Sequence, residues 1–265
     1  MSKIFDDKDR QEALEYILSA AKECKQIVSL VQVGSGAYGF RDAKSDLDFV
    51  IALDSDTSMS QVMDYIKCRI SDKYTLAYST KTEAQHLQVF VLSNLLEIDI
   101  GYGGYEHAAA RKADFTVLYD QTGVVEEKMI QSREWMDDRI YGDKLKRDIE
   151  LARTTAWAHM MHAAVAIQRD NYLRAVGELE YIRKLYVDLL GDRYRLESGM
   201  NHDMDKLPDE EKAAVRSTYV FGETTADLWI SLMKLTELIY KELDGIDIPV
   251  SQDEILEYYN DVREA

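Results

Sequence analysis

The chain has 265 residues with only 2 prolines, and its apolar fraction of 46% is ordinary for a compact globular protein, which excludes a disordered chain. It carries 49 acidic and 32 basic side chains, for a formal charge of −17 that is spread along the sequence. A surface this acidic repels a phosphate backbone and attracts cations. Processive work on nucleic acid is therefore disfavoured, and a neutral or cationic small substrate is favoured.

The features that report on location predict a cytoplasmic protein without a membrane partner. The N-terminal segment MSKIFDDKDRQEALEY lacks the apolar core of a signal peptide, and no run approaches about eighteen consecutive apolar residues. Cys24 and Cys68 each lie in an apolar stripe with helical spacing. We therefore expect two buried free thiols and no disulfide framework.

The N-terminal half alternates helical and strand-like patterns. Apolar residues recur at helical spacing from Ala13 to Val28 and again over 58–71, which predicts two amphipathic helices. Ser93 and Asn94 separate two strand-like runs and predict an antiparallel hairpin. The expected strands are, in chain order, SLVQV (29–33), DLDFVIAL (46–53), HLQVFVL (86–92), LLEIDIGY (95–102) and FTVLYD (115–120).

From about residue 143 onward, long helical patterns replace the strand-like ones and predict an antiparallel helical bundle. The stretch 121–138 is the expected linker. The predicted fold is therefore mixed α/β over residues 1–125, with a mainly antiparallel sheet and flanking helices, followed by an all-α helical-bundle domain over residues 126–265. The first domain is expected to be catalytic and the second to bind the substrate.

Residues 34–39 read GSGAYG and match the dinucleotide-binding pattern G-x-G-x-x-G. In that fold a crossover helix follows the glycines and needs about ten or more residues. Only six residues separate Gly39 from the strand that starts near Asp46. The dinucleotide interpretation therefore fails, and GSGAYG is expected to turn directly into a neighbouring strand.

That strand begins with two carboxylates, Asp46 and Asp48, separated by one residue. Because side chains alternate along a strand, both project from the same face, roughly 7 Å apart. Two like charges held close favour a bound cation, and carboxylate oxygens are ligands that Mg²⁺ prefers. A later strand supplies a third carboxylate, for which Asp99 is our first choice and Glu97 our second. The sequence thus predicts a site for a metal and a triphosphate.

The stretch GSGAYGFRDAKSDLDFVIAL (34–53) resembles the signature of the polymerase-β-type nucleotidyltransferase superfamily, in which a Gly-Ser turn is followed by an Asp-x-Asp or Asp-x-Glu pair and an apolar strand. More narrowly, the chain is similar to the antibiotic-resistance nucleotidyltransferases of the lincosamide and aminoglycoside groups. Its length, its mixed α/β first half and its helical second half all fit them. VLYDQTG, RDNYLRAVGELEYIRKLYVDLL and MDKLPDEEKAAVRSTYV are similar in kind to segments of the lincosamide group.

The resemblance implies a nucleotidyltransferase fold and a role for each residue of the signature. Gly34 and Ser35 would contact the nucleotide phosphates. Asp46 and Asp48 would hold Mg²⁺, and Asp99 would complete the site as the third carboxylate, by binding the metal or by removing a proton from the attacking hydroxyl.

The activity implied is attack of a substrate hydroxyl on the α-phosphorus of a nucleoside triphosphate, ATP being the first choice, with release of pyrophosphate. Lys44 or Arg41 could neutralise the pyrophosphate, although both are also typical surface charges. A protein-modifying, antitoxin-like nucleotidyltransferase and a non-catalytic nucleotide-binding protein on the same fold remain alternatives. Related enzymes build their acceptor cleft between two protomers, so a homodimer is expected by analogy.

The helical half offers two further candidates. His159 and His162 lie three residues apart on a helix and could bind a metal, but no second cluster of His or Cys is close in sequence, so an ordinary structural role is preferred. Glu178 and Glu180 could pair with a cationic substrate, although an acidic helix face is more often solvated.

Overall fold

The structure is a computed structural model that describes residues 4–40, 42–110, 114–219, 222 and 224–264, with the backbone alone for 134–137. The chain divides into two compact units, Met1–Asp137 (unit 1) and Asp138–Ala265 (unit 2). The predicted domain boundary, between residues 125 and 126, lies at the start of a long helix, α3 (Val124–Gln168), and the two units divide further along that helix.

Unit 1 is built on a six-stranded sheet with the order β3-β4-β5-β2-β1-β6. The pair β2 and β5 is parallel, and the other neighbouring strands are antiparallel, so the predicted mixed, mainly antiparallel sheet is confirmed. The elements are α1 (Asp7–Glu23), β1 (Ile27–Gln32), η1 (Gly34–Tyr38), β2 (Leu47–Leu53), η2 (Asp56–Ser58), α2 (Met59–Lys73), β3 (Leu76–Thr82), η3 (Glu83–Gln85), β4 (Leu87–Leu92), β5 (Glu97–Gly104), η4 (Tyr105–His107) and β6 (Thr116–Asp120), where η marks a 3₁₀ helix.

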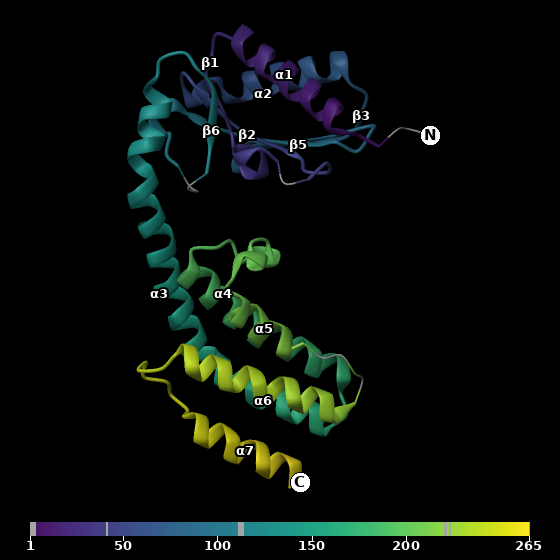
Figure 1. The fold of residues 1–265 in the computed structure, drawn as a ribbon, viewed down its shortest axis with the longest axis vertical. Coiled ribbons are helices and arrows are strands. Elements are labelled where there is room, and N and C mark those ends of the chain that lie inside the picture. Colours follow the sequence, from purple (N-terminus) through teal and green to yellow (C-terminus); the bar gives the residue numbers. More distant parts are fainter. Residues whose placement is uncertain (1–3, 41, 111–113, 220–221, 223, 265) are drawn as a thin grey trace. The chain divides into compact units, whose positions relative to one another are not determined.

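Helices α1 and α2 lie together over one face of the sheet (Figure 1). The apolar stripe of α1, which includes Ile17, and that of α2, which includes Met63, share one core cluster with Phe49 of β2 and Ile98 of β5. Because side chains alternate along a strand, the neighbours of Phe49 and Ile98 face the other side of the sheet. The core therefore determines which face the polar residues of β2 and β5 can occupy.

The structure corrects two of the predicted elements in the first half. Helix α1 ends at Glu23, so Ile27 and Val28 belong to β1 and not to the helix; both are β-branched and suit a strand better. Strand β3 was not predicted, because it lies at the edge of the sheet and alternates little between buried and exposed residues. Cys24 is buried as expected, but Cys68 is exposed.

The predicted linker at 121–138 is also wrong, because most of it forms the first turns of α3. The Asp120 carboxylate accepts hydrogen bonds from the backbone N–H groups of Gly123 at 3.0 Å and Glu126 at 2.9 Å, and so satisfies the helix start. Val125 and Met129 are buried in a second apolar cluster on the sheet. The start of α3 is therefore part of the core of unit 1.

Unit 2 contains helices and no strand among its described residues, in agreement with the predicted helical second half. Besides the later part of α3 these are α4 (Tyr172–Tyr194), η5 (Gly199–Asn201), η6 (Met204–Lys206), α5 (Asp209–Ser217), α6 (Thr225–Glu242) and α7 (Gln252–Glu264). Its core includes Met160 of α3, Tyr186 of α4, Leu232 of α6 and Tyr259 of α7. Within the part of the chain that the structure describes, every helix is too short or too polar to cross a membrane.

The loop between η1 and β2 is held by Arg10, a charged residue of α1 that is only 5% exposed. Its guanidinium donates to the carbonyl oxygens of Asp42 at 2.9 Å and Ser45 at 3.0 Å. It also donates to the Asp7 carboxylate at 2.8 Å and lies 3.9 Å from the centroid of the Phe40 ring. A buried cation with this many partners is satisfied and fixes the chain that leads into β2.

Replacing this anchor should destabilise unit 1 selectively. Arg10→Met keeps much of the aliphatic stem but removes the donors to the loop carbonyls. We expect it to lower the free energy of unfolding of unit 1 by about 1–3 kcal/mol. The matched control is Lys8→Met on the same helix, because the Lys8 side chain is 83% exposed and its ion pair with Glu12 is a surface pair. Hydrogen exchange of the β1 and β2 amides measures the difference, and equal exchange in both variants would contradict the role of Arg10.

Candidate active site

Three carboxylates meet on one face of the sheet of unit 1. Asp48 of β2 and Asp99 of β5 are direct partners in the parallel register, so their side chains leave the sheet on the same face from strands about 4.8 Å apart. Asp46 directly precedes β2 and lies close enough to Asp99 to influence its ionisation. The structure thus brings together all three residues that the sequence predicted as metal ligands.

Asp99 lies in surroundings that disfavour its charge. Burial, and next the negative charges of Glu97 and Asp46, raise the pKa of the Asp99 carboxyl from 3.8 to about 6. Its Oδ1 is buried and has no hydrogen-bond partner among the described residues. Glu97 begins β5 two residues earlier and is exposed, so its charge is solvated by water and gains less from a bound metal. An unpaired, half-buried carboxylate beside two others is an arrangement that a divalent cation would stabilise.

Gly34 places the backbone of η1 directly against the Asp48 carboxylate. Its φ is +63°, in the left-handed region that favours glycine, and a Cβ at this position would lie 2.1 Å from Asp48 Oδ2. The predicted glycine turn is therefore a 3₁₀ helix that begins in contact with the carboxylates. Any side chain at position 34 would push the turn away from the acidic face.

Two unpaired polar groups lie at this turn, one within it and one just before it. Ser35 Oγ and Gln32 Nε2 are both buried without a hydrogen-bond partner among the described residues. Buried donors are normally paired, and those that are not often mark a place for a ligand or water. Gln32 ends β1 and was missed by the sequence analysis, although a polar residue that closes a buried strand next to a glycine turn was an available signal.

Lys44 and Arg41 were predicted to contact the pyrophosphate, and the structure describes only Lys44. The Lys44 ammonium donates to the Phe5 carbonyl oxygen and lies 4.7 Å from the centroid of the Phe5 ring, so its partner here is the segment before α1. Its proposed contact with pyrophosphate stays a prediction. Arg41 lies outside the described residues.

The raised pKa of Asp99 makes its charge destabilising for the metal-free protein. The folded carboxyl holds its proton up to about pH 6 and the unfolded one only to about 3.8, so the unfavourable charge is fully present above pH 6 and is lost as the pH falls through this window. Asp99→Asn should therefore raise the melting temperature in a chelator by about 2–4 °C at neutral pH.

This stability difference should shrink below pH 6 and vanish near pH 4. Asp72→Asn, on the exposed side of α2, is the matched control and should show neither the gain nor this pH dependence. Scanning calorimetry over this pH range is the measurement, and a gain that persists in acid would contradict the assigned ionisation. Added Mg²⁺ should stabilise the wild type more than Asp99→Asn.

The contact between Gly34 and Asp48 predicts a second effect. Gly34→Ala forces a Cβ into the carboxylate at a positive φ and should lower the free energy of unfolding of unit 1 by about 1–3 kcal/mol. Gly103→Ala on β5 is the control, since its Cβ would meet nothing within 4 Å. The same hydrogen-exchange experiment compares the two variants, and equal losses would refute a requirement for glycine at position 34.

Comparison with known proteins does not identify a family for this chain. No protein-family model matches the chain, and no curated protein matches it.

Proposed function

We propose that the chain is a magnesium-dependent nucleotidyltransferase that transfers a nucleoside monophosphate, AMP from ATP being the first choice, to a hydroxyl group of a small molecule. The observation that carries this proposal is the register of β2 and β5, which sets Asp48 beside Asp99, together with Gly34 against the Asp48 carboxylate. A glycine turn, an acidic pair and a third carboxylate from another strand are the parts of the polymerase-β-type site that the sequence resembles.

The donor set suits a hard divalent cation. Asp46, Asp48 and Asp99 would hold Mg²⁺, because they offer only oxygen and because Asp99 Oδ1 is buried without a partner among the described residues. When bound, the ion neutralises the charge on the triphosphate and on the carboxylates themselves. Without that neutralisation, three acidic groups on one face would repel the anionic substrate.

Asp99 is our candidate for the general base. Its carboxylate lies on β5 directly beside Asp48, and an oxygen of it that does not hold the ion could accept the proton of the acceptor hydroxyl. The acceptor oxygen forms a bond to the α-phosphorus, the bond from that phosphorus to the bridging oxygen breaks, and pyrophosphate leaves with the electron pair. The hydroxyl proton passes to Asp99. Glu97 is the second choice, since it is exposed at the start of the same strand.

Gln32 and Ser35 would contribute the neutral contacts to the phosphates. Gln32 lies just before η1 and Ser35 within it, and the donor atom of each is buried without a partner among the described residues. Donors already in position cost little reorganisation when the charge develops, and this is how such sites stabilise a phosphoryl transition state. Because these donors carry no charge, the negative charge of the triphosphate would still have to be neutralised by the cation.

The acceptor is proposed from charge and resemblance. The chain carries a formal charge of −17, which favours cationic molecules near its surface. Lincosamide and aminoglycoside antibiotics carry both hydroxyl and amine groups, and they are the acceptors of the enzymes that the sequence resembles. We therefore propose an antibiotic of one of these two groups as the acceptor.

The test combines a substrate panel with two matched variants. The chain is incubated with Mg²⁺, each nucleoside triphosphate in turn and a panel of lincosamides and aminoglycosides, and pyrophosphate and product mass are measured. Asp48→Asn should lower turnover by about 100-fold or more with the fold retained, because a metal ligand is weakened while the strand is kept. Asp72→Asn removes an equal charge from the exposed side of α2 and should change little.

The outcomes separate the two parts of the proposal. Near-normal turnover by Asp48→Asn would refute the metal assignment. Pyrophosphate release without modification of any antibiotic would refute the acceptor class while leaving the chemistry in place. No pyrophosphate release with any triphosphate would refute the nucleotidyltransferase itself.

A further inference from the structure

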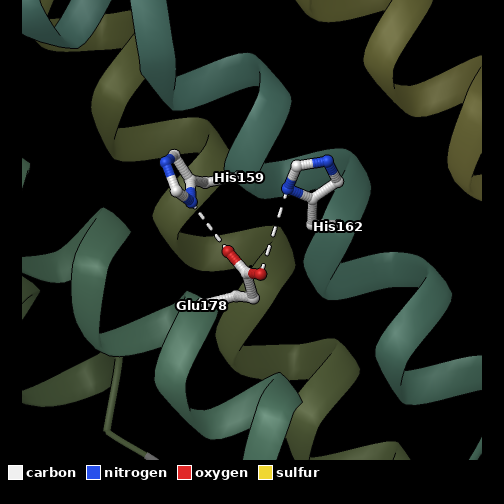
Figure 2. Close-up of side chains that lie close together, drawn as sticks. All are labelled: His159, His162 and Glu178. Atoms are coloured by element: carbon white, nitrogen blue, oxygen red, sulfur yellow. Dashed lines mark hydrogen bonds and ion pairs between the residues drawn. The ribbon is translucent and has the colours of Figure 1, made fainter.

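Unit 2 holds a cluster of metal-ligating side chains that the proposed function does not use. His159 and His162 lie one turn apart on α3 and face Glu178 of α4 (Figure 2). His159 Nδ1 is 2.7 Å from Glu178 Oε2, and His162 Nδ1 is 3.9 Å from Glu178 Oε1. One ligand atom from each residue lies within 4.8 Å of the others. The cluster brings together two of the five histidines of the chain.

The surroundings hold two of these groups in place and leave the third open. The side chain of Glu178 is 15% exposed and that of His159 is 30% exposed. The His159 ring packs on Tyr181, with the ring centroids 4.0 Å apart and the planes at 32°. The side chain of His162 is 55% exposed, so the cluster opens to solvent on its side. A ligand can therefore enter without unfolding of the helices.

We propose that His159, His162 and Glu178 form a binding site for a zinc ion with one position left open. Two imidazoles and one carboxylate are a ligand set that zinc takes with water or a substrate as the fourth ligand. Bonds of about 2.0–2.1 Å put the donors of a tetrahedral site roughly 3.4 Å apart. The present separation of up to 4.8 Å is wider than this, so the side chains must rotate when the ion binds. Imidazole ligands also distinguish this site from the all-oxygen site proposed for Mg²⁺.

Arg174 is the competitor for this site. It lies four residues before Glu178 on α4, and its Nε is 3.6 Å from Glu178 Oε1. The guanidinium neutralises the carboxylate when no metal is present, and its side chain is 54% exposed and can swing away. Zinc must replace this ion pair, so Arg174 weakens the binding of the metal.

The test is zinc titration of the full chain by calorimetry, with Co²⁺ as a spectroscopic probe, in excess Mg²⁺ so that the carboxylates of unit 1 are occupied. We expect one equivalent of zinc and a Co²⁺ absorption typical of four or five ligands including nitrogen. His159→Asn and Glu178→Gln should each weaken binding by at least about tenfold, since even groups that only support a ligand contribute that much. Arg174→Gln should strengthen binding severalfold.

Asp48→Asn is the matched control, because it removes a carboxylate of the proposed magnesium site and should leave zinc binding unchanged. Circular dichroism checks that each variant is folded, and Glu178→Gln tests the site should His159→Asn fail to fold. Absence of zinc binding by the wild-type chain, or binding that survives both replacements, would overturn the proposal. An unchanged affinity in Arg174→Gln would overturn the competition, and loss of binding in Asp48→Asn would move the metal to unit 1.

Discussion

The direct pairing of Asp48 with Asp99 across parallel strands is the constraint on which unit 1 depends. Burial of Asp99, and next the negative charges of Glu97 and Asp46, make its ionised form costly. The apolar residues that alternate with Asp48 and Asp99 bury under α1 and α2, and this core holds the acidic face in place. A shift of the register by one residue would bury the carboxylates in the core, so the hydrophobic pattern that stabilises the sheet also sets the geometry of the site.

The chain leading into this pair is positioned from two sides. Gly34 allows η1 to touch the Asp48 carboxylate, and Arg10 ties the loop before β2 to α1. Helix α1 therefore contributes through its apolar stripe, which covers the sheet, and through one buried cation, which orders the loop. The ionised Asp99 carboxylate has a raised free energy in the metal-free protein, and a bound divalent cation would lower it.

The two units offer different donor atoms. Unit 1 presents carboxylate oxygens on a sheet face. This set suits a hard cation whose remaining ligands are phosphate oxygens of a substrate. Unit 2 presents two imidazoles and one carboxylate between α3 and α4, a set suited to zinc. The donor atoms would thus direct the two proposed metals to different units. Magnesium prefers the carboxylate oxygens of unit 1, and zinc prefers the imidazole nitrogens of unit 2.

Much of the local structure was predictable from the sequence, because periodicity and turn residues act over a few positions. Alternation placed Asp46 and Asp48 on one face, and the short interval after Gly39 excluded a crossover helix. The less regular elements were not predictable in the same way. The edge strand β3 alternates little between buried and exposed residues, and the first turns of α3 have a linker-like composition but are held by Asp120 and by burial of Val125.

The sequence by itself determined the two local patterns from which the site is predicted, GSGAYG and the acidic pair. Only the tertiary structure decided what they meet. Strand β5 inserts between β4 and β2 and runs parallel to β2, which brings Asp99 beside Asp48. The packing of α3 against α4 brings Glu178 to His159. These contacts join segments far apart in the chain, and such pairings arise from packing of the whole core, which no local pattern encodes.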